Sequence, residues 1–213
     1  MSILHRTRIK FCGLTREEDV DAAVAAGADA LGFVLWPGSK RAIDERRLVE
    51  LSARVPAFVT RVGLFVDPSA SLVACCSPHL DLLQFHGDET PGACEAAGRP
   101  WIKALRMREG LDLPAAAEAY RGARALLLDA YRPGVPGGTG ETFDWSRIPA
   151  SLAKPVILAG GLTPDNVDAA IAAVGPFAVD VSGGIETAPG VKDATRMAAF
   201  LDAVRRADDR RSR

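Results

Sequence analysis

Short apolar runs alternate with amphipathic stretches along the whole chain, at a spacing of roughly 20–30 residues. An apolar run flanked by turn residues indicates a buried strand, and an amphipathic stretch indicates a helix that covers it. The predicted strands are 8–12, 29–35, 59–66, 81–86, 101–105, 124–129, 155–159 and 177–181. The predicted helices are 15–26, 44–54, 69–76, 89–97, 112–121, 145–152, 164–173 and 193–206.

Eight strand–helix units predict an α/β protein in which one (β/α)8 barrel, a closed parallel sheet with outer helices, spans residues 1–213. Consecutive apolar residues, as at 125–128, are typical of parallel strands covered by helices. A doubly wound open sheet is the alternative, but no G-x-G-x-x-G pattern follows the first strand. The residues after Val204 are charged or small, so we expect a frayed tail from about 205 to 213.

Local signals support several of the helices. Residues 15–18, Thr-Arg-Glu-Glu, match a capping box, and Asp44 can cap the second helix. Gly27 and Gly98 fall where a helix is expected to end. The helices at 69–76 and 145–152 have the weakest signals.

The composition limits the class of partner. At 213 residues and 48% hydrophobic content, the chain can bury one large core. Its formal net charge is −1 and both signs are interspersed, so nothing suggests a nucleic-acid or membrane partner. The start of the sequence lacks the apolar core of a signal peptide. Four cysteines without disulfide or metal-site spacing favour a reducing cytoplasm. The sequence does not decide between a monomer and a homodimer.

Paired glycines follow the last two predicted strands, Gly160-Gly161 after the seventh and Ser182-Gly183-Gly184 after the eighth. Because glycine has no Cβ, backbone N–H groups there can approach an anion closely. Thr163-Pro164 predicts a helix N-cap with proline in the first turn, so a positive helix end follows the first pair. Barrels of this class bind phosphate at this place, which predicts a phosphate site. The alternative is that the glycines only make tight turns.

Catalytic candidates should lie at the carboxyl ends of the strands. Cys12 ends the first strand before Gly13 and a capped helix, whose N-terminus would favour the thiolate of a base or nucleophile. The alternative for Cys12 is a small buried apolar residue. Asp129 closes a very apolar strand, where burial favours the neutral carboxyl of a general acid. A capping or loop-anchoring aspartate is the alternative.

Other polar residues at the strand ends have weaker signals. For Asp67 and Asp180 a structural hydrogen-bonding role is the stronger prediction. His86 suits either acid–base work or fixing of its loop. Arg41, in the basic loop 37–41, could hold a carboxylate or belong to a solvated turn. The glycine-rich loop 131–140, which contains Gly137 and Gly138, suits a flexible lid or an exposed excursion.

On eight stretches taken in order, between about residues 8 and 203, the chain resembles the phosphoribosylanthranilate isomerase family of tryptophan biosynthesis. The stretches are Lys10-Phe11-Cys12-Gly13-Leu14-Thr15, the Pro37/Ser39/Arg41 loop, Val62-Gly63-Leu64-Phe65-Val66, Leu83-Gln84-Phe85-His86-Gly87, Leu128-Asp129, Gly137-Gly138-Thr139-Gly140, Ala159-Gly160-Gly161-Leu162 and Asp180-Val181-Ser182. Phe11 and Phe85 replace smaller aliphatic residues common in the family. Gly183 replaces a common second serine, which affects the expected phosphate loop.

The resemblance implies a (β/α)8 fold, no cofactor, and an intramolecular aldose–ketose isomerisation, the Amadori rearrangement of N-(5-phosphoribosyl)anthranilate. It implies that Cys12 is the general base, Asp129 the general acid and Arg41 the binder of the substrate carboxylate. It also implies phosphate contacts from Gly160-Gly161 and Ser182-Gly183-Gly184. The residues with expected supporting roles are His86, Asp180, Gly137 and Gly138.

Two other phosphate-binding barrels are the nearest rivals among enzymes. The histidine-pathway sugar-phosphate isomerase would be expected to have an Asp where Cys12 stands, and an indole-glycerol-phosphate synthase would need catalytic Lys and Glu at strand ends. Outside enzymes, the chain could be a sugar-phosphate binding protein without catalysis. The presence of both Cys12 and Asp129 argues against that class.

Overall fold

The structure is a computed structural model that describes residues 6–130, 143–149 and 151–211. Among these residues, eight parallel strands close into a barrel in chain order, and β1 pairs with β8 to complete it. The strands are β1 (Arg8–Cys12), β2 (Ala30–Val34), β3 (Thr60–Phe65), β4 (Leu82–Phe85), β5 (Trp101–Arg106), β6 (Leu126–Asp129), β7 (Val156–Leu158) and β8 (Ala178–Val181). Each strand end lies within two residues of its prediction, and the predicted (β/α)8 fold is confirmed.

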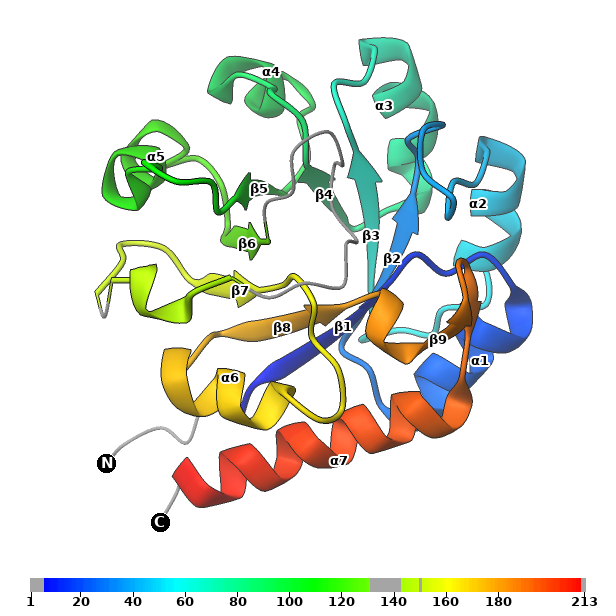
Figure 1. The fold of residues 1–213 in the computed structure, drawn as a ribbon. Coiled ribbons are helices and arrows are strands. Elements are labelled where there is room, and N and C mark those ends of the chain that lie inside the picture. The colour runs from blue at the N-terminus through cyan, green and yellow to red at the C-terminus, as the bar shows by residue number, and fades with distance from the viewer. Residues whose placement is uncertain (1–5, 131–142, 150, 212–213) are drawn as a thin grey trace.

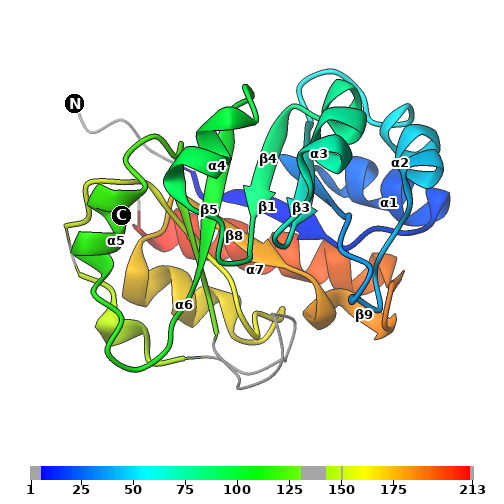
Figure 2. The same cartoon turned by 90° about the horizontal axis from the view of Figure 1, so that it is seen from above.

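The helices lie around the outside of the strands, as Figures 1 and 2 show. They are α1 (Glu17–Ala26), α2 (Glu45–Ser52), α3 (Ala70–Cys76), α4 (Pro91–Ala96), α5 (Leu113–Ala119), α6 (Val167–Val174) and α7 (Ala194–Arg211). Short 3-10 turns are η1 (Ser77–His79), η2 (Trp145–Arg147) and η3 (Gly183–Ile185). A hairpin of β9 (Glu186–Ala188) and β10 (Val191–Lys192) connects η3 to α7.

Successive side chains of a strand point to opposite faces, so each strand contributes to two separate cores. The inner core consists of small and medium apolar side chains of β5 to β8 and the residues beside them. Its members are Ile102, Ala104, Ala125, Leu127, Ile157, Ala159 and Ala178. Between β1 and β8 the barrel interior also contains a polar pair, in which the Lys10 ammonium donates to Asp180.

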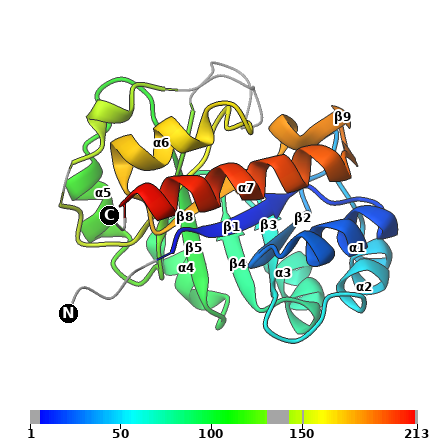
Figure 3. The same ribbon diagram turned by 90° about the horizontal axis from the view of Figure 1, so that it is seen from below.

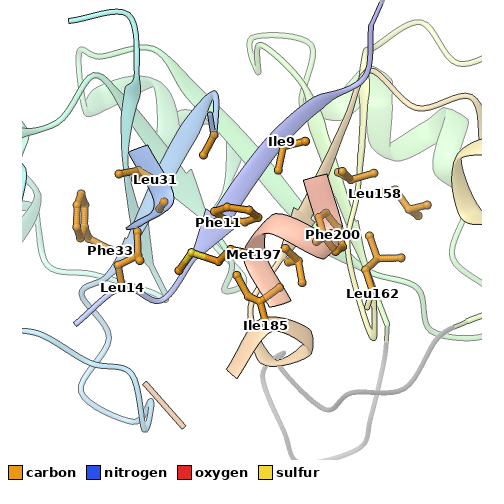
Figure 4. Close-up of a cluster of buried hydrophobic side chains, with 14 of the residues drawn as sticks. Ile9, Phe11, Leu14, Leu31, Phe33, Leu158, Leu162, Ile185, Met197 and Phe200 are labelled. Atoms are coloured by element: carbon orange, nitrogen blue, oxygen red, sulfur yellow. The ribbon is translucent and has the colours of Figure 1, made fainter. Parts of the chain in front are cut away.

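The outer core packs the opposite face of β1 against α7. Phe11 and Phe200 meet edge to face, with ring centroids 6.2 Å apart, and Figure 4 shows Met197 and Ile185 beside them. Burial of one such side chain contributes about 1.5–3 kcal/mol to the free energy of unfolding. Since Phe11 faces outward, Lys10 and Cys12 on the same strand face the barrel interior.

Helix α7 runs alongside both α6 and α1, as Figures 1 and 3 show. It continues to Arg211, and Ala207 is buried, so the prediction of fraying from residue 205 is wrong for residues 205–211. The apolar stripe of the helix extends into the charged segment and keeps it packed. Near the end of α7, Asp208 also accepts hydrogen bonds from the amide and hydroxyl of Thr7, both at 2.7 Å.

Three predicted helix features differ from the structure. The capping box is wrong, because the Thr15 hydroxyl donates to the Gly190 carbonyl at 2.6 Å and α1 begins at Glu17. The predicted helix at 145–152 is only the turn η2, because Pro149 disfavours helical backbone at the residue before it. Helix α6 begins at Val167 rather than 164, after a turn in which the Val167 amide donates to the Thr163 carbonyl. The Asp44 cap and the left-handed Gly27 are confirmed.

Candidate active site

A cavity of about 280 Å³ opens at the carboxyl ends of the strands. It collects side chains and glycines from the ends of every strand except β5 and from several of the loops that follow them. The polar and glycine residues of its lining are Cys12, Ser39, Arg41, Gln84, His86, Asp129, Gly160, Gly161, Thr163, Asp180, Ser182, Gly183 and Gly184. The structure therefore places in one cavity every predicted site residue that it describes. Gly137 and Gly138 lie outside the described residues.

Cys12 ends β1, and its side chain is buried, with 5% of the residue exposed. Burial raises the pKa of the Cys12 thiol, and the Lys10 ammonium opposes this; Asp180 raises the pKa further and Lys192 lowers it. We expected a helix N-terminus to favour the thiolate, but α1 begins only at Glu17 and has three acidic residues in its first turn. These acids offset the positive helix end. The cations that face Cys12 come from β1 and β10 instead.

Asp129 ends β6 and faces His86, which follows β4. The His86 Nε2 and Asp129 Oδ2 atoms are 3.3 Å apart, but their geometry is not that of a hydrogen bond, and Nε2 has no partner among the described residues. On the other side of the ring, His86 Nδ1 lies 3.4 Å from Gln84 Nε2. A polar ligand group in the cavity, beside His86 and Asp129, could therefore contact both.

The two glycine loops touch each other. A Cβ on Gly184 would lie 2.0 Å from the Leu162 carbonyl oxygen, and one on Gly160 would lie 2.4 Å from the Ala130 amide nitrogen. Both positions therefore require glycine for close backbone packing, and Gly160 also has a φ of +85°. Asn166 fixes the first loop, because its amide group donates to the Gly161 carbonyl and accepts from the Thr163 amide. The glycines therefore allow the two loops to pack tightly, and this role does not conflict with the predicted anion site.

Arg41 is not part of a solvated turn. Its Nε and Nη2 atoms donate to the two carboxylate oxygens of Glu186, at 2.8 and 2.7 Å. The Lys192 ammonium donates to Glu186 Oε1 at 2.8 Å and to the Cys12 carbonyl at 2.6 Å. Although burial favours the neutral form of Glu186, Arg41 and Lys192 outweigh it and lower the pKa of this carboxyl. The β9–β10 hairpin thus ties the loop of Arg41 to the end of β1.

Sequence reasoning missed three charged residues that contact the cavity lining: Lys10, Glu186 and Lys192. The signal for Lys10 was available, because a lysine two positions before Cys12 shares its face of the strand. Glu186 and Lys192 lie in a short hairpin that no apolar pattern marked. Asp67 does not line the cavity; its carboxylate accepts from the Asp88 amide at 2.8 Å, which is the predicted structural role.

The described part of the chain contains no group of three or more His, Cys, Asp or Glu side chains that could hold a metal ion. Over the same residues, none of the helices is both long and apolar enough to span a membrane.

Comparisons with known proteins agree over most of the chain. A sequence model of the family described as N-(5'phosphoribosyl)anthranilate (PRA) isomerase matches residues 9–203. An N-(5'-phosphoribosyl)anthranilate isomerase of Chromohalobacter salexigens is 70% identical over 203 residues, 95% of this chain and 96% of the relative. The crystal structure of phosphoribosyl anthranilate isomerase from Thermotoga maritima has a TM-score of 0.85 at 37% identity, covering 93% of this chain and 98% of that one. Such an isomerase in complex with reduced 1-(o-carboxyphenylamino)-1-deoxyribulose 5-phosphate has a TM-score of 0.83 at 36% identity, with the same coverage.

Proposed function

The chain belongs to the N-(5'-phosphoribosyl)anthranilate isomerase family, and we propose that it performs this isomerisation with Cys12 as general base and Asp129 as general acid. The reaction is an Amadori rearrangement in tryptophan biosynthesis: an aminosugar phosphate of the aldose type becomes a 1-deoxyribulose phosphate. The observation that carries the residue assignment is the shared cavity, into which β1 and β6 bring a thiol and a carboxyl from separate walls.

The chemistry needs one acid and one base. The neutral Asp129 carboxyl gives its proton to the ribose ring oxygen as the bond from C1 to that oxygen breaks, and the anthranilate nitrogen lone pair forms the C1=N double bond of a Schiff base. The Cys12 thiolate then takes the proton from C2, and the electrons of that C–H bond form a C1=C2 double bond and return the C=N pair to nitrogen. The resulting enolamine tautomerises to the C2 ketone by moving the C2 hydroxyl proton to C1.

The substrate has two anionic ends, and the cavity offers a site for each. We assign the phosphate to the Gly160-Gly161 and Ser182-Gly183-Gly184 loops, whose backbones lie against one wall of the cavity. We assign the anthranilate carboxylate to Arg41. An arginine has five N–H donors, and Glu186 occupies one on Nε and one on Nη2. The remaining donors can bind the substrate while Glu186 holds the guanidinium in place.

His86 and Asp180 are assigned supporting roles. His86 lies beside Asp129, and its Nε2 atom has no hydrogen-bond partner among the described residues. It can therefore bind a ribose hydroxyl next to the acid. Asp180 faces the cavity from β8 and holds the Lys10 ammonium at 2.8 Å.

One assay tests the function and the assignments together. Purified protein is mixed with phosphoribosylanthranilate, and turnover is followed as loss of substrate fluorescence. We expect turnover by the natural protein and a large loss in Cys12→Ser and in Asp129→Asn. Binding of substrate without turnover by the natural protein would instead identify a sugar-phosphate binding protein.

The proposal also covers the partner, the domain organisation, the location and the oligomeric state of the enzyme. The partner is a small-molecule substrate, with no nucleic acid and no membrane, and residues 1–213 form one barrel domain. Four free cysteines support a cytoplasmic location. The protein is a monomer or a homodimer, which sedimentation velocity at several concentrations distinguishes.

A further inference from the structure

A buried lysine faces the barrel interior one step below Cys12. Lys10 lies two residues earlier on β1, so its side chain shares the face of Cys12. Its ammonium donates to Asp180 Oδ1 of β8 at 2.8 Å, and the side chains of both residues are almost fully buried. The reaction described above uses neither the ammonium nor its carboxylate partner as an acid or a base.

Gly32 on the neighbouring strand brings the lysine and the thiol together. A Cβ on Gly32 would lie 2.8 Å from the Cys12 sulfur and 3.1 Å from Lys10 Cε. The sulfur and Cε therefore both approach the same empty position beside β2, and their separation is at most the two distances combined. An opposite charge at roughly 4–6 Å favours the charged form of an ionisable group.

The other charges around Cys12 are already occupied or act against the thiolate. Lys192 of β10 donates to the Cys12 carbonyl, to Ser182 and to Glu186. Arg41, from the loop after β2, is paired with the same Glu186. Asp180 of β8 opposes the thiolate, and Asp129 and His86 face the cavity from β6 and β4. Lys10 is the cation whose effect on the Cys12 thiol is largest among these groups.

Stability alone gives little reason for this ion pair. A lysine and a carboxylate inside an apolar barrel lose their hydration, and well-packed apolar side chains are often at least as stabilising. Burial by itself would lower the pKa of Lys10, but Asp180 and Cys12 outweigh burial and raise it, so the group is a cation. Asp180 thus keeps a permanent positive charge beneath the sulfur.

We propose that Lys10 is a positioning residue whose buried ammonium stabilises the thiolate of Cys12, with Asp180 as the counter-ion that holds the ammonium in place. This role rests on the proposed function, in which Cys12 must be a thiolate in order to take the C2 proton.

The test measures the ionisation of Cys12 directly. The ultraviolet absorbance of the thiolate is recorded against pH for each protein, and the curve of the same protein with Cys12→Ser is subtracted. In Lys10→Met we expect the ionised fraction of Cys12 at a fixed pH below its midpoint to fall about tenfold or more. The rising limb of kcat against pH should move to higher pH by about one unit or more, which corresponds to that tenfold change.

Lys10→Gln provides a second neutral variant and protects the test if Lys10→Met does not fold. The glutamine amide can still donate to Asp180 but carries no charge, so the ionised fraction of Cys12 should fall as in Lys10→Met. The matched control is Lys103→Met, because Lys103 is a buried lysine paired with Glu89 on the outward face of β5. Its loss should leave the Cys12 titration unchanged.

The outcomes separate this inference from the proposed function. An unchanged Cys12 titration in Lys10→Met or in Lys10→Gln overturns the role of Lys10. Near-normal kcat in Cys12→Ser overturns Cys12 as the base, whatever the titration of the thiol shows.

Discussion

Two buried lysine–carboxylate pairs in this barrel have nearly the same local geometry and different surroundings. Lys10 and Asp180 are 2.8 Å apart with side chains 5% and 10% exposed, and Lys103 and Glu89 are 2.8 Å apart with 2% and 5%. The first pair lies inside the barrel beneath the Cys12 thiol. The second lies outside the barrel, where Lys103 also donates to the carbonyls of Phe85 and Gly87 and so fixes the loop after β4. Distance and burial alone therefore do not separate a structural pair from one with the role that we propose for Lys10 and Asp180.

The largest expected effect is on stability, and it should be the same for both pairs. Lys10→Met and Lys103→Met each leave a buried carboxylate without its cation, which costs about 3–5 kcal/mol of unfolding free energy. Urea unfolding followed by circular dichroism measures this cost. The exposed ion pair of Arg46 with Glu50 provides the control, and Arg46→Met should change stability by about 0–1 kcal/mol. If only one of the two substitutions lowered the unfolding free energy, the two buried pairs would not contribute equally to stability.

The second expected effect is on catalysis. It concerns Cys12 and Asp129, which face the barrel interior as Lys10 and Asp180 do. Cys12→Ser and Asp129→Asn should each lower kcat at least ~10²-fold, the low end of the contribution of general acid–base catalysis, with little change in KM. Because the two residues act on one substrate, the double mutant should lose less than the product of the single losses.

Matched controls exist for both catalytic substitutions. Cys94→Ser makes the same change at a buried thiol of α4, and Asp67→Asn makes the same change at a carboxylate that only fixes a loop. Both should keep kcat within a few-fold of the natural enzyme. If a control lost as much kcat as Cys12→Ser or Asp129→Asn, the loss could not be assigned to an acid–base role of Cys12 and Asp129.

A third, smaller effect concerns the recognition of the substrate carboxylate. Arg41→Ala should lower kcat/KM by a factor that corresponds to about 1.5–3 kcal/mol of lost binding free energy, the contribution of a charge-assisted hydrogen bond. Arg47→Ala is the control, because Arg47 of α2 pairs with Glu17 and Glu50 away from the cavity. Unchanged kcat/KM in Arg41→Ala would mean that Arg41 serves only to hold Glu186.

The smallest expected effect is the pH dependence of stability at Glu186, which binds two cations where Asp180 and Glu89 each bind one lysine. Its pKa in the folded state lies below the ordinary value of 4.5, so its stabilisation is complete above that value and is lost as the pH falls through the lower, folded-state pKa. Urea unfolding from about pH 6 to about pH 3 should show a steeper loss for the natural protein than for Glu186→Gln. Equal slopes would mean that Glu186 titrates alike in both states.

The strands, the fold class and most of the candidate site were predictable from the sequence. Parallel strands covered by helices are continuously apolar, so the runs at 8–12 and 124–129 identified strands and their ends. In a barrel those ends meet at one mouth, so the order of the strands alone predicts that Cys12, Asp129 and the glycine pairs lie together. Their catalytic and binding roles remain predictions.

The tertiary structure alone decided which charges meet. Lys10 and Asp180 are 170 residues apart in the chain, and Arg41 and Glu186 are 145 apart, so no local pattern could pair them. The capping box failed because the Thr15 hydroxyl bonds the distant Gly190 carbonyl. For the same reason, the group that we propose to stabilise the thiolate is a lysine held by β8 rather than the helix end expected from the sequence. Local propensity acts over a few residues, whereas the electrostatics of a buried site depend on whatever the closed barrel brings within a few ångströms.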